Sequence, residues 1–399
     1  MKVGLFHPGT QHSRQTARAL AELDRLAWFA TSIYPSAGIA RRWPAIAHFR
    51  DPSVPDHLVR SFGGEEWVER LVARLGLKSL ARRVDRFGNR RFARRIADAA
   101  AREGVGLWGY DGSSAAAFAD PRLGGAVKVL DRTIADWRSW NDIADRLQDR
   151  WPDWITGADL KVPETRIATD RQEYEGATHI LCGAPFVAQT IAEHEGSDIQ
   201  AKLRVLPYAH DDRLFRMEEE PSSVEAKEPI RFLFVGQLSL RKGLPILLEA
   251  FARLPAARAR LTLAGDVMVR DAALARYTDR VEYVGRVSRS AMPDLMRRHH
   301  VLVLPSWFEG SAITLLEARA MGLAIVQTAA AGRGADADSG IVIGEPDVDA
   351  LEDALAVLLD DPDRVNAMRK AAWLGAHEHT HAAYTRDIGA FLETISPER

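Results

Sequence analysis

The chain has 399 residues, of which 46% are hydrophobic and 27% charged, with a formal net charge of -2 at pH 7. This is the composition of a soluble globular protein with room for two domains. No apolar run reaches the roughly 18 to 20 residues that a membrane-spanning helix needs, and the first residues already predict a strand instead of a signal peptide, so we expect a cytoplasmic protein.

Short runs of β-branched residues alternate with helical stretches in both halves, which predicts an α/β protein with parallel sheets. The first strand gives way at Gly9 and Thr10 to a helix within "FHPGTQHSRQTARALAEL" (6 to 23). This turn lacks G-x-G-x-x-G, which argues against a dinucleotide-dependent oxidoreductase. His12 is either a polar lining residue or proton carrier, or an ordinary surface histidine.

Residues 74–102 form a helical stretch with ten basic and two acidic residues, in a chain of net negative charge. No nucleic-acid motif accompanies the stretch, so we expect no nucleic-acid partner. A basic amphipathic helix binds anionic membrane surfaces, and a solvated surface helix is the alternative. Trp43 and Phe49 are interfacial anchors in the first interpretation and core residues in the second.

Two further features of the amino half concern reactive groups. Asp131 ends the predicted strand in "AVKVLDRTIADW" (126 to 137), where it either orients a hydroxyl group or caps a helix that starts near Thr133. The single cysteine, Cys182, excludes a disulfide within the chain, and its apolar neighbours predict a buried side chain.

The segment "RMEEEPSSVEAKEP" (216 to 229) is acidic, contains two prolines and has no periodicity, so it predicts a linker. We therefore expect a first domain over residues 1–210 and a second over residues 211–375. Residues 376–399 predict a C-terminal helix, for which packing back on the first domain is one arrangement.

Six apolar runs of the second half predict strands, with helical patterns between most of them, at residues 231–235, 260–265, 281–285, 301–305, 324–328 and 340–344. Strands joined by such crossovers form a doubly wound sheet, which binds ligands beyond the carboxyl ends of its strands. The loops that follow these strands are therefore the places to search for a binding site.

The loop after the fourth of these strands leads into a helix within "LPSWFEGSAITLLEARAMG" (304 to 322). Ser311 is a suitable N-cap, which would leave the amides near Ala312 and Ile313 free. Free amides at the positive end of a helix bind phosphate.

Two glutamates flank this helix start. Glu317 lies one turn inside the helix and can accept two hydroxyl groups, as a ribose diol requires. Glu309 precedes the helix and would meet the group beyond the phosphates. The alternatives are a loop charge at position 309 and a solvated helix residue at position 317.

The loop after the first strand of this half, within "FLFVGQLSLRKGLPILLEAF" (232 to 251), places Arg241 and Lys242 before Gly243 at a helix start. The helix dipole disfavours cations there unless an anion lies between them. A diphosphate bound by Arg241, Lys242 and the facing helix end explains the arrangement, and a solvated turn is the alternative.

Together the two loops resemble the donor-site signature of the family 4 retaining glycosyltransferases. "VGQLSLRKGLPILLEAF" is similar to the family's VGRL…KG…LL.AF segment, and "PSWFEGSAITLLEARAMGLAIV" to its PS..EGFG…LEAMA.G.PVI segment, with the same spacing of the two glutamates. Weaker similarity covers residues 176–191, 204–215 and 337–362. The resemblance implies the GT-B fold, in which two Rossmann-like domains face each other across a cleft, and it implies neither a cofactor nor a metal ion.

The resemblance also implies roles for matching residues. Arg241 and Lys242 would bind the diphosphate of a nucleotide sugar, and Glu317 would bind the ribose. Glu309 would face the sugar or its reacting carbon, where positive charge develops. The other donor-side positions are Gly236, Gln237, Gly265, Asp266, Arg286, Val287, Gly310, Ser311, Ala312 and Ile313, and those suited to the acceptor side are Gly9, Thr10 and His12. Positions 265, 266, 286 and 287 also fit plain strand exits.

Two departures from the family pattern affect these expectations. Gln237 stands where many relatives have arginine, so Arg241 would have to supply the missing cation. Many relatives have a histidine in a loop of the amino domain, whereas this chain offers Asp131 and Arg132 at the matching place. Asp131 is therefore the candidate for orienting the acceptor.

These observations predict a metal-independent retaining glycosyltransferase that moves a sugar from a nucleotide-diphosphate sugar to a glycan or lipid-linked acceptor, in polysaccharide or glycolipid synthesis. The basic stretch would hold the cleft at the inner face of the cytoplasmic membrane. A nucleotide-sugar epimerase or hydrolase of the same fold is one alternative. A catalytically weak scaffold protein that binds sugar nucleotides is the other.

Overall fold

The computed structural model describes residues 1–9, 12–32, 34–43, 46, 49–62, 78–157, 160–225 and 227–395, with the side chains of the long basic helix from Arg91 onward. Thr10, which the sequence places on the acceptor side, and residues 74–77 of the basic stretch lie outside the described residues.

The first half of the chain folds around a parallel sheet with the strand order β3-β2-β1-β4-β5-β6-β7. Its strands are β1 (Val3–Phe6), β2 (Leu26–Thr31), β3 (Val59–Ser61), β4 (Gly106–Tyr110), β5 (Lys128–Arg132), β6 (His179–Cys182) and β7 (Leu203–Val205). Its helices are α1 (Ser13–Glu22), α2 (Ala37–Arg42), α5 (Lys78–Glu103), α6 (Ala115–Phe118), α7 (Trp137–Arg150), α8 (Glu164–Gly176), α9 (Pro185–His194) and α10 (Ser197–Gln200), with 3₁₀ helices η1 (Asp56–Leu58), η2 (Pro121–Leu123) and η3 (Pro152–Trp154).

The second half folds around a parallel sheet with the order β10-β9-β8-β11-β12-β13, which confirms the six predicted strands. The strands are β8 (Ile230–Val235), β9 (Ala259–Ala264), β10 (Val281–Gly285), β11 (Val301–Leu304), β12 (Ala324–Thr328) and β13 (Gly340–Ile343). The helices are α11 (Leu244–Arg253), α12 (Asp271–Leu274), α13 (Met292–Arg297), α14 (Ile313–Ala320), α15 (Val348–Asp360), α16 (Pro362–Gly375) and α17 (His381–Ile395), with 3₁₀ helices η4 (Ala275–Tyr277), η5 (Arg289–Ala291), η6 (Ala329–Ala331) and η7 (Ala376–His379).

Apolar burial explains these elements. The central strands β8 and β11 consist mainly of side chains that are buried, as expected for parallel strands covered on both faces. Cys182, at the end of β6, is fully buried as predicted, and burial raises the pKa of its thiol to about 12. In the described part of α5, Phe92 and Ile96 are buried, whereas Arg91 and Arg94 are exposed.

The strand order reverses between β1 and β4 in the first sheet and between β8 and β11 in the second. Ligands of doubly wound sheets bind beyond the carboxyl ends of the strands at such a reversal. The loop after β8 contains Arg241 and Lys242, and the loop after β11 contains Glu309. Topology thus brings the two loops singled out in the sequence to one place.

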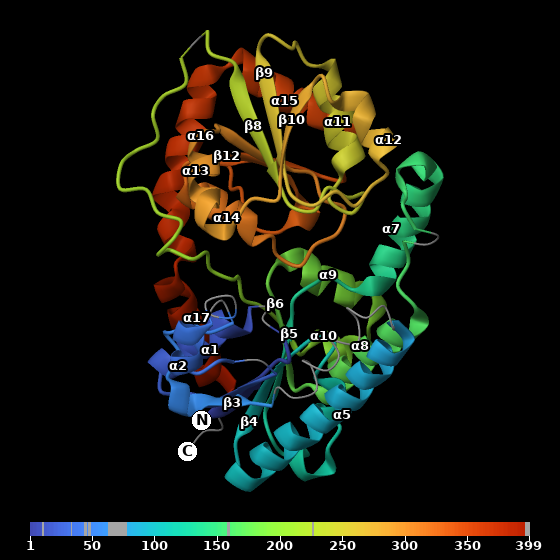
Figure 1. The fold of residues 1–399 in the computed structure, drawn as a ribbon, viewed down its shortest axis with the longest axis vertical. Helices are drawn as coiled ribbons and strands as arrows, with labels where there is room; N and C mark the ends of the chain where they lie inside the picture. Colours follow the sequence, from blue (N-terminus) through green and yellow to red (C-terminus); the bar gives the residue numbers. More distant parts are fainter. Residues whose placement is uncertain are drawn as a thin grey trace.

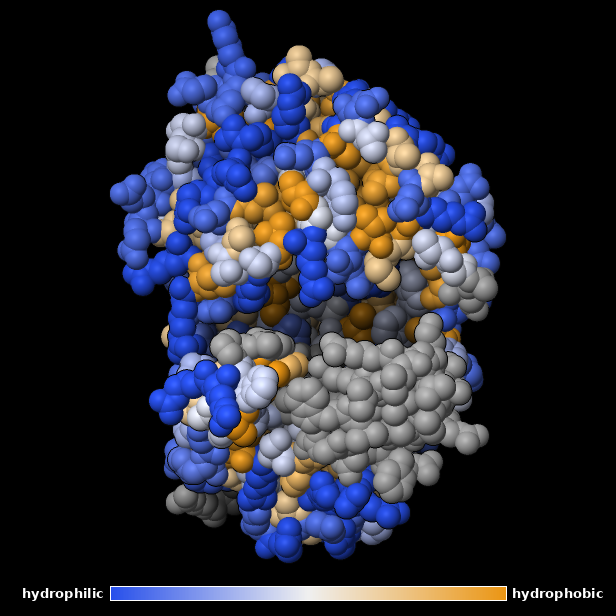
Figure 2. All heavy atoms as spheres, viewed as in Figure 1, coloured by the Kyte–Doolittle hydropathy of each residue, from blue (hydrophilic) through white to orange (hydrophobic). Residues whose placement is uncertain are grey.

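The two halves lie one above the other (Figure 1). The irregular chain after β7 leads up to β8, α7 rises beside the upper half, and the chain after α16 returns to the lower half. There α17 packs beside α1, where Tyr384 and Ile388 join a buried cluster of the first sheet. The space-filling view shows a hollow between the halves on the face drawn (Figure 2).

None of the helices in the described ranges is both long and apolar enough to span a membrane.

Candidate donor-binding and catalytic site

Arg241, Lys242 and Glu309 form one cluster at the strand-order reversal of the second sheet. Lys242 Nζ lies 2.6 Å and Arg241 Nη1 lies 3.0 Å from the same oxygen, Oε1 of Glu309. Arg241 also donates a hydrogen bond of 2.8 Å to the carbonyl of Phe308. The carboxylate is buried, with 7% of Glu309 exposed, so the pairing takes place largely out of water. Among the described residues, the cluster therefore places two adjacent cations against one acidic partner, Glu309.

A glycine makes the approach of these two loops possible. Gly243, the N-cap of α11, has a φ of 72°, and a Cβ atom added to it would lie 1.9 Å from the carbonyl oxygen of Pro305. Only glycine combines that backbone conformation with so close a contact. Gly236, which directly follows β8, lies close to the side chain of Lys242, since a Cβ atom added to Gly236 would be 3.5 Å from Lys242 Cε.

The start of α14 differs from the sequence-based expectation. Ala312, not Ser311, is the N-cap, and no side chain caps the helix. The prediction of a Ser311 cap is therefore wrong by one residue. The Ala312 amide is also not free, because it donates a hydrogen bond of 3.1 Å to the carbonyl of Ala331. Within the described residues, the amides of Gly310 and Ser311 donate no hydrogen bond, and Ile313 is the first helical residue.

Glu317 lies one turn into α14 and is 5% exposed. Arg289 Nη1 donates to its Oε1 at 2.8 Å, and Arg289 Nη2 is 3.8 Å from Asp211. Burial raises the pKa of Glu317, and the charge of Arg289 offsets part of this effect. Glu317 is thus a buried acid that, among the described residues, pairs with the cation Arg289, and it is not the solvated residue of the alternative interpretation.

Glu317 and His12 line the same cavity, which has a volume of about 690 Å³ and lies between the two halves. Its lining includes residues of α1, of the loop at 50–52, of the segment 209–213 and of α14. The imidazole of His12 stacks on Tyr208 at 4.1 Å between ring centroids. Burial lowers the pKa of His12 to about 4, so the ring is neutral near pH 7. Gly9 lies in the preceding turn, where its amide donates to Nδ1 of His7 at 3.0 Å.

Asp131 lies inside β5 and is 2% exposed. Its carboxylate accepts hydrogen bonds from Tyr208 at 2.5 Å and from Trp108 Nε1 at 3.3 Å. The capping alternative is wrong, because the next helix, α7, begins at Trp137 and its N-cap is Asp136. The acceptor-orienting role stays a prediction.

The remaining donor-side positions lie at the carboxyl ends of β8, β9 and β10. Gln237, which stands where many relatives have arginine, is exposed. Asp266 and Arg286 are both exposed, and their charged groups are 4.0 Å apart. Gly265 touches the β8 loop, since an added Cβ would be 1.7 Å from the carbonyl oxygen of Gly236. Val287 is half-buried beside Arg286.

Two features of the site had no signal in the sequence analysis. Arg289, the partner of Glu317, is 28 positions away in the sequence, and no spacing rule connects them. The aromatic side chain of Phe308 enters the first domain, beside Trp137 and Trp140. Only the positions of whole elements bring these groups together.

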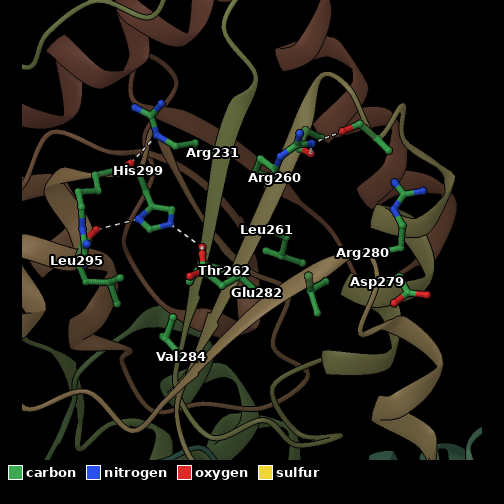
Figure 3. Close-up of a pocket in the computed structure, with 14 residues that line it drawn as sticks. Arg231, Arg260, Leu261, Thr262, Asp279, Arg280, Glu282, Val284, Leu295 and His299 are labelled. Carbon is green, nitrogen blue, oxygen red and sulfur yellow. Dashed lines mark hydrogen bonds between the residues drawn. The ribbon is translucent and has the colours of Figure 1, made fainter.

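A second cavity of about 670 Å³ lies over β8, β9 and β10 (Figure 3). Its polar side chains include His299, whose ring nitrogens bond to Thr262 at 2.8 Å and to the carbonyl of Leu295 at 2.8 Å. Arg231 and Arg260 line it near the starts of β8 and β9. The cavity therefore lies toward the amino ends of these strands, away from the loops that carry Lys242.

Comparison with known proteins identifies the domain. Residues 215–373 match the family model described as "Glycosyl transferases group 1". A D-inositol 3-phosphate glycosyltransferase of Kribbella flavida is 27% identical over 237 residues, which cover 54% of this chain and 56% of that protein. A glycogen synthase of Mycobacterium tuberculosis is 30% identical over 157 residues, covering 36% and 37%. The matches thus span about half or less of these curated relatives.

Solved structures match over the whole chain. A sucrose-phosphate synthase from Thermosynechococcus elongatus has a TM-score of 0.67 and 17% identity, and covers 99% of each chain. Anabaena Alr3699/HepE in complex with UDP-glucose has a TM-score of 0.63 and 13% identity, and covers 99% of this chain and 100% of that one. The second domain of the chain therefore belongs to the group 1 glycosyl transferases, and the two domains together form the GT-B fold.

Proposed function

We propose that the protein is a retaining glycosyltransferase that moves a hexosyl group from a nucleotide-diphosphate sugar to a glycan or lipid-linked acceptor. The observation that carries this proposal is the cluster in which Lys242 and Arg241 share one oxygen of Glu309 at 2.6 Å and 3.0 Å. Two cations beside a carboxylate match a substrate whose diphosphate is negative and whose sugar becomes positive in the transition state.

In this proposal the diphosphate replaces Glu309 as the partner of Lys242 and Arg241. The bond between the anomeric carbon and the diphosphate oxygen then breaks, and its electron pair leaves with the nucleoside diphosphate. The acceptor hydroxyl forms the new bond on the same face of the sugar and transfers its proton to the departing phosphate oxygen. Glu309, released from its two cations, stabilises the positive charge on the sugar.

The nucleoside would lie in the cavity next to Glu317. A carboxylate accepts hydroxyl protons at both oxygens, which suits the ribose diol. Arg289 now donates to this carboxylate at 2.8 Å, so nucleoside binding would have to displace or share Arg289. That HepE binds UDP-glucose supports a nucleotide sugar as the donor, and the base and sugar are questions for experiment.

Side chains supply the positive charge that this reaction requires, so the proposal includes no metal ion or cofactor. Charge-assisted contacts from Lys and Arg to a diphosphate do the same electrostatic work as a bound cation. Adding a chelator should therefore leave donor turnover unchanged.

The test is donor turnover with and without acceptors. Uridine, guanosine and adenosine diphosphate sugars are first screened by thermal shift, and the stabilising donor is incubated with candidate glycans and lipid-linked sugars. Turnover that requires an acceptor supports the transferase. Isomerised donor would identify an epimerase, and release of free sugar that no acceptor accelerates or diverts would identify a hydrolase.

Binding without turnover would identify a scaffold protein, an alternative favoured by two observations. Gln237 leaves the donor site without the arginine of many relatives, and Asp131 is buried at the place where they have a histidine. The absence of these two groups would lower catalytic power.

A further inference from the structure

The loop that carries Glu309 belongs to the second domain but is held by the first. Phe308 is fully buried, and its ring centroid lies 5.3 Å from Trp137, 5.5 Å from Trp140 and 6.4 Å from Phe186. These three residues, which we call the aromatic socket, come from α7 and α9 of the first domain. The residue directly before Glu309 is thus anchored across the cleft.

The backbone on the other side of that anchor touches the first domain as well. The amide of Ala135 donates a hydrogen bond of 3.2 Å to the carbonyl of Glu309. A Cβ atom added to Gly310 would lie 1.7 Å from the carbonyl oxygen of Thr133 and 2.9 Å from Ile134 Cα. Backbone therefore meets backbone at this point, and only a glycine leaves room for the contact.

Residues 133–135, the receiving loop, are fixed by a buried arginine. Arg132 is 0% exposed, and its Nε donates to the carbonyl of Ile134 at 2.7 Å while its Nη2 donates to that of Ala135 at 2.9 Å. Its Nη1 lies 2.7 Å from a carboxylate oxygen of Asp170. A buried guanidinium is costly unless it is paired and hydrogen-bonded, and these partners meet that requirement while fixing the receiving loop.

The other end of the receiving loop is bound by Asp111. Its Oδ1 accepts from the amide of Thr133 at 3.0 Å and from the Thr133 hydroxyl at 2.6 Å. Burial alone would raise the pKa of Asp111, but the charges of Arg132 and Arg166 outweigh burial and hold the pKa below its ordinary value. Asp111 is therefore ionised at neutral pH, and its negative charge strengthens both hydrogen bonds.

We propose that Arg132 is a positioning residue for Glu309. By holding residues 133–135 in one conformation, Arg132 fixes the backbone of Glu309 and Gly310 from across the cleft, while the aromatic socket holds Phe308. The inference rests on the proposed function, in which Glu309 must lie at a set distance from the reacting carbon. Misplacement of such a group by about 1 Å costs on the order of 100-fold in rate.

The experiment compares Gly310→Ala, Arg132→Lys and the double variant with wild type. Gly344→Ala is the matched control, because an added Cβ at Gly344 meets nothing within 4 Å. Three quantities are measured, namely kcat for donor turnover, the Kd of UDP and of GDP by calorimetry, and the radius of gyration by small-angle X-ray scattering. Thermal unfolding checks that each variant is folded, and Gly310→Ala tests the same contact from the other domain if Arg132→Lys does not fold.

Positioning predicts that kcat falls by about 10- to 100-fold in either single variant, with a change of less than about threefold in the nucleotide Kd of Arg132→Lys. Both substitutions act on one contact. The fold-decrease in kcat of the double variant should therefore be much smaller than the product of the two single fold-decreases. The radius of gyration should increase in Gly310→Ala and stay at the wild-type value in Gly344→Ala.

Wild-type kcat in Gly310→Ala would overturn the inference. So would multiplicative effects on kcat in the double variant, or a nucleotide Kd of Arg132→Lys that rises as much as its kcat falls. The residues would then act independently in the first case and on binding in the second. If wild type turns over no donor, the proposed function fails separately. Small-angle X-ray scattering would then be the only test of the contact between Gly310 and the receiving loop. An unchanged radius of gyration in Gly310→Ala would refute that contact.

Discussion

Lys242 and Arg241 both bind one oxygen of Glu309, so the carboxylate and a diphosphate would compete for the same two cations. Such competition would lower donor affinity, because the pairing with Glu309 would have to be broken first. It also links the two roles, since the diphosphate that takes the cations leaves the carboxylate free to face the sugar. In the proposed reaction, these three side chains would thus set the order of events, with diphosphate binding first and electrostatic stabilisation of the sugar afterwards.

Lys242→Ala should weaken binding of a nucleoside diphosphate far more than binding of the corresponding nucleoside. A charge-assisted contact contributes about 1.5 to 3 kcal/mol, which is roughly 10- to 100-fold in affinity. Calorimetry with UDP against uridine, and GDP against guanosine, measures the difference. Lys370→Ala, which removes an exposed lysine paired with Glu220, is the control. Equal losses for nucleotide and nucleoside would show that Lys242 does not bind phosphate.

The two glutamates should respond differently when each becomes glutamine. Glu317→Gln should mainly raise the donor KM, because a ribose contact stabilises the ground state and the transition state alike. Glu309→Gln should lower kcat by about 100-fold or more while diphosphate affinity stays equal or increases, since the competing carboxylate is gone. Steady-state kinetics, or slow donor hydrolysis before an acceptor is known, checks both. Wild-type kcat in Glu309→Gln would refute the catalytic role.

Asp131 should make the stability of the fold depend on pH. Burial raises its pKa from an ordinary 3.8 to about 7, so the folded chain binds this proton more tightly than the unfolded chain. The contribution is fully present below about pH 4 and is lost as the pH rises through about 7, by roughly 4 kcal/mol at about 1.4 kcal/mol per pKa unit. Asp131→Asn should therefore lose less stability than wild type between about pH 5 and pH 8 in urea unfolding. The exposed Asp294→Asn should behave like wild type, and an unchanged pH dependence in Asp131→Asn would contradict the assignment.

At the scale of elements, the strands of the second sheet could be predicted because their apolar runs are long and separated by helical patterns. The loop residues Arg241, Lys242 and Glu309 could be placed at one edge because the strand order of such sheets is regular. The first residue of α14 could not be predicted, because contact with the first domain determines the conformation of the loop that precedes this helix. A Cβ added to Gly183 would lie 3.0 Å from Ser311 Cβ, and Ser311 makes no cap.

The junction between β8 and α11 should be sensitive to one added methyl group. Gly243→Ala would place a side chain at a φ of 72° and 1.9 Å from the carbonyl oxygen of Pro305. The left-handed conformation alone costs about 1 to 2 kcal/mol, and relief of the contact must move the loop that carries Lys242. Urea unfolding should show a loss of roughly 2 to 4 kcal/mol and calorimetry a weaker diphosphate contact. Gly344→Ala should show neither, and equal stability of the two variants would contradict this account of the junction.

At the scale of the whole molecule, the sequence could not predict which side chains of the two domains contact each other. Phe308 fills an aromatic socket more than 100 positions away, and Trp151 of the first domain donates to Glu249 of the second at 3.0 Å. Such contacts depend on how two finished domains meet, and neither periodicity nor motif spacing encodes that arrangement. The same contacts make the geometry of the cleft a property of both domains.

The basic stretch also belongs to this scale, because it concerns where the whole molecule sits. The described part of α5 packs its apolar side chains, among them Phe92 and Ile96, into the first domain. Those residues are therefore not available to insert into a lipid surface. The exposed side chains of this part of the helix include the charged Arg91 and Arg94. We therefore propose that any membrane binding through this part of α5 is electrostatic and sensitive to salt.

Replacing the exposed Arg91 and Arg94 with glutamine should therefore release the protein from anionic vesicles. Each lost charge near such a surface should cost about 1 kcal/mol at low salt, so the double substitution should weaken binding by roughly 30-fold. Sedimentation with vesicles of phosphatidylserine and phosphatidylcholine measures this, and raising the salt should give the same loss in wild type. The matched control is Arg253→Gln with Arg258→Gln, which removes two charges from the second domain and should leave vesicle binding unchanged. Because α5 is remote from the strand-order reversal that holds Lys242, nucleotide affinity should stay at the wild-type value in both double variants. If wild type fails to sediment with these vesicles at low salt, the membrane proposal is refuted and the exposed arginines form only a solvated face.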